Sequence, residues 1–328
     1  MANGSIPVID LSGWTQDDSP PSELARAVRH ALEHVGFFVL TGHGVGEALI
    51  EAAFSQCARF HAQNGEAKQH VRLDRNNNGY MAAKSTTIRT STLSRNERYD
   101  LNEAFFFRPE LAPDHPDVLA GRQYRGLNQW PDGLPGFRES ALDYAGAMLA
   151  LARRLQRVLA TGLDLPADWF DAMTGDPQFV VRFSHYLPAT GPRDRYGLSP
   201  HTDASFFTLL PQTEVPGLEI RLPDGTWQAP PYLSGSIVFN SGDMLHRWSN
   251  GRLLSTPHRA LPPAGRERYA VPFFYGPDWD AEIACLPTCL EPGERPHWSP
   301  ITYADYMTWW YEQNYASAHR PHSTEAAS

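Results

Sequence analysis

The stretch that decides how this chain folds is Leu198-Ser199-Pro200-His201-Thr202-Asp203. On an extended strand, side chains two positions apart project from the same face, so the imidazole of His201 and the carboxylate of Asp203 converge there. A second imidazole follows 57 positions later (258 − 201), at His258 in Ser255-Thr256-Pro257-His258-Arg259, which leaves room for several strands to return it across a sheet. Two imidazoles and one carboxylate on one side of an ion are typical of a non-haem Fe(II) centre with open coordination positions. The chain has 13 histidines, so the tripeptide alone is a weak signal and its context has to decide.

The sequence around these residues adds groups that bind a carboxylate. Arg268 lies ten positions after His258 (268 − 258), inside Glu267-Arg268-Tyr269-Ala270-Val271-Pro272-Phe273-Phe274, which alternates as a strand does before it becomes aromatic. A guanidinium offers a carboxylate a planar, permanently charged pair of donors. Upstream, Val181-Arg182-Phe183-Ser184-His185-Tyr186-Leu187-Pro188 is a second strand-like run, and it carries the phenol of Tyr186. The pattern therefore predicts strands around a pocket that holds a metal and an anion.

With these residues in place, the chain resembles the 2-oxoglutarate/Fe(II)-dependent dioxygenases of the isopenicillin N synthase-like family, nearly from end to end. The segments that carry the resemblance are Ser5-Ile6-Pro7-Val8-Ile9-Asp10-Leu11, the helix-to-strand step over residues 33–45, Asn128-Gln129-Trp130-Pro131, Asp224-Gly225-Thr226-Trp227, Asn240-Ser241-Gly242-Asp243 and Trp248-Ser249-Asn250-Gly251-Arg252. Each segment is short, but their order along the chain makes the set specific.

The resemblance implies an α+β fold with a predominantly β core, in which a double-stranded β-helix (jelly roll) is flanked by helices and an N-terminal mixed region. We expect residues 1–130 to form the N-terminal mixed α/β region and residues 131–316 to form the jelly-roll catalytic core. Within that core, apolar residues at three- and four-residue spacing predict a long scaffold helix over residues 137–163. Its expected apolar stripe is Leu142, Ala145, Leu149, Ala152, Leu155 and Leu159. Residues 317–328 are polar and small, and we expect them to form a disordered tail.

The resemblance also implies an oxygenase that uses Fe(II), 2-oxoglutarate and O2, with ascorbate as a reductant. The metal ligands would be His201, Asp203 and His258, and the far carboxylate of 2-oxoglutarate would meet Arg268 and the hydroxyl of Tyr186. Oxidative decarboxylation to succinate and CO2 would be coupled to hydroxylation, desaturation or cyclisation of a small organic molecule, a specialised metabolite or an amino-acid derivative. Candidates for an apolar substrate wall are Phe105, Phe107, Phe206 and Phe274.

One position departs from the family pattern, which is Arg-x-Ser after the second histidine. Here the third residue is Ala270, and losing one hydroxyl hydrogen bond to a charged group costs about 1.5–3 kcal/mol when nothing replaces it. The departure leaves open a 2-oxoglutarate-independent Fe(II) oxidase of the isopenicillin N synthase or aminocyclopropane-carboxylate oxidase kind, although the retained Arg268 argues against it. A catalytically silent jelly roll that binds a small ligand is the other alternative, and the intact metal-ligand set argues against that one.

Composition limits the class of partner. A formal net charge of −9 argues against a nucleic-acid surface, and no apolar run is long enough to span a membrane. The N-terminus has no basic stretch followed by an apolar one, so it does not predict a secretory signal. The three cysteines, Cys57, Cys285 and Cys289, form no disulfide framework and fit a reducing cytoplasm. The sequence leaves the oligomeric state open.

Three other features invite functional interpretations for which a structural role is the better prediction. His246 lies between the metal ligands in sequence but lacks their pattern, so we expect a surface or turn histidine. His185 precedes Tyr186 on a strand and therefore points to the opposite face. Trp309-Trp310-Tyr311 falls where the family often has a helix over the pocket; for at least two of these aromatics, core packing is the better prediction.

Overall fold

The computed structural model describes residues 5–14, 19–86, 88–91, 93, 99–188 and 196–315. Most of the strands belong to a nine-stranded sheet and a four-stranded sheet. The strands of the large sheet are β1 (Val8–Asp10), β2 (Phe37–Thr41), β3 (Gly79–Met81), β4 (Asn102–Phe107), β5 (Pro177–Tyr186), β7 (Phe207–Pro211), β10 (Ile237–Ser241), β12 (Arg268–Ala270) and β13 (Phe273–Asp278). Those of the small sheet are β6 (Leu198–His201), β8 (Leu218–Arg221), β9 (Trp227–Gln228) and β11 (His258–Ala260).

The order of the large sheet is β1-β2-β10-β7-β13-β5-β4-β3, with β12 also paired to β5, and the small sheet runs β6-β11-β8-β9. All the pairs are antiparallel except β1 with β2. A separate pair is formed by β14 (Glu282–Ile283) and β15 (Ile301–Thr302). Two sheets whose neighbouring strands are far apart in sequence are the jelly-roll arrangement, so the predicted fold class is confirmed.

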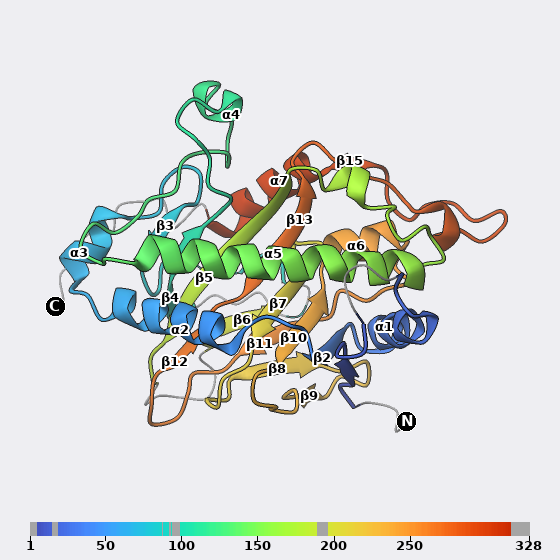
Figure 1. Cartoon of the computed structure of the whole chain (residues 1–328), viewed down its shortest axis with the longest axis horizontal. Coiled ribbons are helices and arrows are strands. Elements are labelled where there is room, and N and C mark those ends of the chain that lie inside the picture. The colour runs from blue at the N-terminus through green and yellow to red at the C-terminus, as the bar shows by residue number, and fades with distance from the viewer. Residues whose placement is uncertain are drawn as a thin grey trace.

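Helices cover one side of the large sheet, where α5 crosses the strands with α1 and α2 beside it (Figure 1). The helices are α1 (Ser22–His34), α2 (Glu47–His61), α3 (Gly65–His70), α4 (Pro116–Leu119), α5 (Phe137–Gly162), α6 (Asp243–Trp248) and α7 (Tyr303–Tyr315). At the end of α1 the chain turns into β2 at Gly36, whose φ is +75°. A Cβ there would lie 2.2 Å from Thr256 Oγ1, so only glycine fits.

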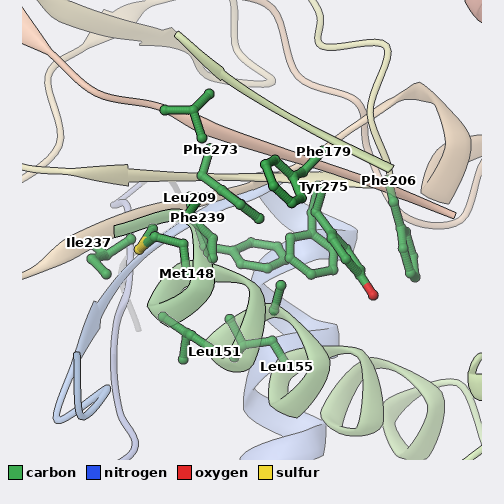
Figure 2. Packing of buried hydrophobic residues seen from close by; sticks show 14 of the residues in the cluster. Met148, Leu151, Leu155, Phe179, Phe206, Leu209, Ile237, Phe239, Phe273 and Tyr275 are labelled. Atoms are coloured by element: carbon green, nitrogen blue, oxygen red, sulfur yellow. The ribbon is translucent and has the colours of Figure 1, made fainter. Parts of the chain in front are cut away.

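The predicted scaffold helix is α5, and it packs its apolar face on the strands of the large sheet (Figure 2). Ala145, Ala152, Leu155 and Leu159 of the expected stripe are buried, whereas Leu142 and Leu149 are only half-buried. Tyr144, Met148 and Leu151 are buried as well. The buried face is therefore wider than the predicted stripe and displaced by about one position, because helices packed on either side extend the contact surface.

The large sheet draws strands from both predicted regions of the chain. From the first 130 residues, β2 pairs with β10 and β4 pairs with β5. The N-terminal region is therefore built into the same sheet as the catalytic strands. The predicted tail over residues 317–328 lies outside the described residues.

Two further expectations concern cysteines and membranes. All three cysteines are free; Cys57 is buried, while Cys285 and Cys289 are partly exposed. Within the described ranges, none of the helices combines the length and the apolar character needed to cross a membrane.

Candidate functional site

His201, Asp203 and His258 come together between the two sheets. His201 ends β6 and His258 begins β11, and the two residues are direct partners in the antiparallel pairing, with ring centroids 4.4 Å apart. Asp203 Oδ1 lies 3.6 Å from Nε2 of each imidazole. Because β6 ends at His201, Asp203 lies on the connection to β7 rather than on the strand that the two-residue spacing predicted. The three side chains nevertheless converge and are all buried.

Backbone carbonyls orient both imidazoles. His201 Nδ1 lies 2.7 Å from Ser199 O, and His258 Nδ1 lies 3.2 Å from Thr256 O. A carbonyl only accepts, so each Nδ1 carries the proton and each Nε2 presents a lone pair toward Asp203 Oδ1. Burial, followed by the proximity of His258, lowers the pKa of His201 to about 3. The neutral imidazole that results is the form that binds a metal.

Hydrogen bonds also fix the orientation of the Asp203 carboxylate. Asp203 Oδ2 accepts hydrogen bonds from Thr208 Oγ1 at 2.5 Å and Asn240 Nδ2 at 2.8 Å, which leaves Oδ1 free to face the imidazoles. Burial opposes ionisation of Asp203, but the two histidines and these hydrogen bonds outweigh it and lower the pKa of its carboxyl group. Two neutral nitrogens and one anionic oxygen are a donor set that fits Fe(II).

The turn after β10 holds the connection that carries Asp203. The backbone N–H of Asp243 donates to Asp203 O at 2.7 Å, and that of Gly242 donates to Phe206 O at 3.0 Å. A Cβ at Gly242 would lie 2.0 Å from Ser205 O, so the approach requires glycine. Through these contacts the segment Asn240-Ser241-Gly242-Asp243 fixes the backbone around Asp203.

A first cavity runs from the three ligands to Arg268, lined by residues of both sheets. Arg268 and Tyr186 are direct partners in the pairing of β12 with β5, and the guanidinium carbon lies 4.9 Å from the centroid of the Tyr186 ring. Two glycines make room for them: a Cβ at Gly217 would lie 2.9 Å from Arg268 Cδ, and one at Gly197 would lie 2.7 Å from Tyr186 Cδ1. Arg268 Nε is buried without a hydrogen-bond partner among the described residues, so the cavity offers an unused donor.

A second unused polar group in this cavity is the hydroxyl of Ser184, which the sequence motifs do not predict. Ala270, which stands where the family has serine, pairs directly with Ser184 on β5. Ser184 Oγ is fully buried and has no hydrogen-bond partner within the described part of the chain. Ser184 lies two positions before Tyr186, so strand alternation places both on the cavity side. That spacing is the signal that could have identified it.

A second cavity lies on the other side of the ligands, and it is mostly apolar. The two cavities share Arg182, His201, Asp203 and Phe274. One wall of the second cavity is α7, which contributes Tyr303, Met307, Trp310, Tyr311 and Tyr315. Of the aromatic triplet on this helix, Trp309 is 46% exposed, whereas Trp310 and Tyr311 face the cavity. Helix α7 therefore closes the cavity with aromatic side chains.

Of the four predicted wall residues, the structure places only Phe274 on this cavity. Phe105 and Phe107 are fully buried in the core, because side chains alternate along β4 and Phe106 is the one that shares a face with Arg182, its partner on β5. Phe206 packs against Trp248, with ring centroids 4.8 Å apart, inside the core seen in Figure 2. On β4, the cavity is therefore lined by Phe106 and not by the predicted neighbours Phe105 and Phe107.

Three of the other histidines have structural roles. His246 lies on α6 with Nδ1 2.6 Å from Leu253 O. His185 lies on the opposite face of β5 from Tyr186, and there its Nδ1 is 2.8 Å from Glu103 Oε1. His61 joins them, so this cluster also brings two imidazoles to one carboxylate.

A metal is not needed in that second cluster. Lys68 Nζ lies 2.9 Å from Glu103 Oε2, and the Tyr80 hydroxyl donates to the same oxygen. Both carboxylate oxygens therefore already have protein partners, and an ammonium group balances the charge. We interpret the cluster as a buried ion-pair network that joins helices to the sheet.

Two family models match the chain. One, described as the non-haem dioxygenase in morphine synthesis N-terminal, matches residues 6–133. The other, the 2OG-Fe(II) oxygenase superfamily, matches residues 175–277, the range that contains the three ligands and Arg268.

Relatives that align over most of this chain carry names of the same enzyme class. The chain is 33% identical to the 2-oxoglutarate-Fe(II) type oxidoreductase hxnY of Emericella nidulans, over 100% of this chain and 98% of that protein. It is 31% identical to validamycin A dioxygenase of Streptomyces hygroscopicus, over 86% of this chain and 80% of that protein.

Solved structures show the same fold. A 2OG-Fe(II) oxygenase family protein of Caulobacter crescentus superposes with a TM-score of 0.82 at 27% identity, covering 94% of this chain and 99% of that one. A Neurospora crassa protein, solved in complex with alpha-KG and thymine, has a TM-score of 0.81 at 24% identity, covering 95% and 98% of the two chains.

Proposed function

Since the chain belongs to the 2OG-Fe(II) oxygenase superfamily, we propose that its His201, Asp203 and His258 hold Fe(II). The observation that carries this assignment is the convergence of two Nε2 lone pairs and one free carboxylate oxygen in a buried site. The chemistry supplied by the bound metal with 2-oxoglutarate and O2 is oxidative decarboxylation to succinate and CO2, coupled to hydroxylation, desaturation or cyclisation of a small organic molecule. The residues of this chain bind and orient the reactants and keep water from the site.

The first cavity is proposed as the 2-oxoglutarate site. Arg268 and the Tyr186 hydroxyl would bind the distal carboxylate, and the Tyr186 ring would also pack against the guanidinium. The Ser184 hydroxyl would supply the hydrogen bond that the Arg-x-Ser serine makes in the family, because it faces Ala270 across the strand pair. Its buried, unpartnered oxygen supports this role, since such a group is costly unless a ligand satisfies it.

The substrate class is proposed from the relatives and from the second cavity. A specialised metabolite or an amino-acid derivative fits a small cavity walled by aromatic side chains. Validamycin A dioxygenase, a relative of similar length, supports the first of these. We place the reaction in the cytoplasm, a proposal supported by the three free thiols.

The experiment that tests the metal and co-substrate sites is an anaerobic titration of the Fe(II)-loaded protein with 2-oxoglutarate. A saturable visible charge-transfer band is expected, and Arg268→Ala should weaken 2-oxoglutarate binding while Fe(II) still binds. His201→Ala should abolish Fe(II) binding itself. Fe(II) binding without a band would overturn the assignment of the first cavity and favour an oxidase that needs no 2-oxoglutarate.

A further inference from the structure

Two arginines line the second cavity, whose wall is mostly apolar away from His201 and Asp203. Arg182 lies on β5 and Arg108 follows the end of β4; they are 5% and 6% exposed. Phe107 pairs with Val181, so Arg108 comes level with Val180, which lines the same cavity. Burying a guanidinium is costly unless it is paired and hydrogen-bonded. Their partners therefore indicate which of the two is available to a ligand.

Arg182 has a neutral hydrogen-bond partner, Asn102, and lies within the electrostatic reach of one carboxylate, that of Asp100. The oxygen of the Asn102 amide accepts from Arg182 Nη2 in the amide orientation that satisfies both groups. Asp100 lies close enough for the charge of Arg182 to favour its ionised form, although burial raises the pKa of Asp100 to about 6. The guanidinium also lies 5.3 Å from the Phe106 ring. Arg182 Nε is itself buried without a hydrogen-bond partner among the described residues, so the two arginines differ in the carboxylate near Arg182 rather than in having a free donor.

The contacts of Arg108 are different. Its Nη2 donates to the hydroxyl of Tyr311 at 2.9 Å, and its guanidinium carbon lies 5.3 Å from the centre of that ring. Its Nη1 is buried without a hydrogen-bond partner, and among the described residues no carboxylate forms an ion pair with it. A buried cation with a free donor, on the wall of a cavity that reaches the metal ligands, is suited to an anion that arrives with the ligand.

We propose that the substrate is a small carboxylic acid with an apolar or aromatic body, whose carboxylate binds Arg108. The inference rests on the proposed function and names the substrate class of that same site. The body of the acid would lie between Phe106, Phe274 and the aromatic residues of α7. Arg108 would then be a specificity-determining residue, with Tyr311 holding its guanidinium.

Alternate residues of β5 line the two cavities, and their sequence order gives their spatial order from the first cavity to the second. Tyr186 and Ser184 lie in the first cavity, Arg182 lies where the cavities meet beside the ligands, and Val180 lies in the second. Each step of two residues along a strand is about 6.6 Å. Arg108 therefore lies about one step beyond Arg182, on the side away from Arg268. The carbon that is oxidised would be separated from the carboxylate by part of the body of the substrate.

The test uses matched acids and amides as probes: benzoate with benzamide, phenylacetate with phenylacetamide, and 3-phenylpropionate with 3-phenylpropionamide. Binding to the full-length Fe(II) protein is measured by calorimetry under nitrogen, with saturating 2-oxoglutarate to occupy the Arg268 end. At least one acid should bind about tenfold or more tightly than its amide. Arg108→Leu should reduce that preference to within about twofold, while Arg26→Leu, which removes an exposed arginine of α1, should leave it unchanged.

The 2-oxoglutarate charge-transfer band serves as a control that distinguishes failure of this inference from failure of the proposed function. The 2-oxoglutarate charge-transfer band should persist in Arg108→Leu, which shows that the variant folds and binds its co-substrate. If that variant loses the band, Arg108→Lys, which keeps the charge without the planar fork, should retain a reduced preference. No acid preference in any pair, or a preference that survives in Arg108→Leu, overturns the inference. Absence of the band in the wild type contradicts the proposed function instead, and the calorimetric comparison still decides the role of Arg108.

Discussion

In the proposed 2-oxoglutarate site, Ser184 replaces a hydroxyl that Ala270 lacks, from the opposite strand of a pair. They are direct partners between β12 and β5, and directly opposed side chains lie about 5 Å apart at Cβ. A hydroxyl at position 184 can therefore reach the space that a serine at position 270 would fill. Sequence alone shows that position 270 has no hydroxyl, whereas the proposed compensation by Ser184 depends on a pairing between segments that are far apart in the chain.

Ser184→Ala should weaken 2-oxoglutarate binding about tenfold or more, because a hydrogen bond to a charged group is worth about 1.5–3 kcal/mol. Adding Ala270→Ser to that variant should restore most of the affinity. Dissociation constants come from the anaerobic charge-transfer titration. An unchanged affinity in Ser184→Ala would exclude the hydroxyl from the carboxylate site.

At the same scale, the metal ligands could be predicted and their supports could not. His201, Asp203 and His258 follow from residue type and spacing, and the structure brings them together. Thr208 and Asn240, which hold Asp203, come from two different strands and carry no local signal. Phe105 and Phe107 were predicted on the wrong face because β4 is buried along its whole length and so shows no alternation in sequence.

At the scale of elements, the turn between β10 and α6 controls the connection that carries Asp203. Gly242→Ala would place a Cβ 2.0 Å from Ser205 O, so the connection has to move. We expect loss of Fe(II) affinity together with a lower Tm, measured by anaerobic calorimetry and thermal unfolding. The matched control is Gly146→Ala on α5, where a Cβ meets nothing within 4 Å. That change should raise the free energy of unfolding by up to about 1 kcal/mol and leave Fe(II) binding unchanged.

The long helices were the most predictable elements, because a periodic apolar face is a strong local signal. The scaffold helix over residues 137–163 corresponds to α5, which the structure places over Phe137–Gly162. Its exact buried face was less predictable, since α1 and α2 pack on its flanks and bury positions outside the stripe. The strand β3 directly follows the polar residues Asn76, Asn77 and Asn78 and has no strand signal of its own, so it forms because β4 offers a pairing edge.

At the scale of the whole molecule, Glu103 links elements that are distant in sequence. It contacts His61 at the end of α2, Lys68 on α3 and His185 on β5. Burial alone would raise the pKa of Glu103, but the contacts with His185, His61 and Tyr80 lower it below its usual range. A carboxyl whose pKa is lowered by folding stabilises the folded state above its unfolded pKa, and this contribution is lost as the pH falls.

Glu103→Gln should therefore lower the free energy of unfolding by about 3 kcal/mol at neutral pH, since it leaves Lys68 as an unpaired buried cation. The difference from the wild type should shrink as the pH falls below about 4.5. Urea unfolding at several pH values measures both effects. Adding Lys68→Met to Glu103→Gln should recover part of the stability. A difference that is constant with pH would show that the loss comes from packing rather than from charge.

The nine-stranded sheet takes strands from both predicted regions, so we expect the two regions to unfold as one cooperative unit. In a fragment of residues 131–316, β10 would lose its partner β2 and β5 would lose its partner β4, so two edges of unpaired backbone groups would be exposed. Helix α5 would also lose α1 and α2, which cover its flanks. We expect this fragment to show no cooperative thermal transition and no Fe(II) binding. Co-expression with residues 1–130 should restore both, because the missing strands can pair from a separate chain. A fragment that folds and binds Fe(II) alone would mean that the small sheet and the central strands suffice, and that the N-terminal strands only extend a core that is already stable.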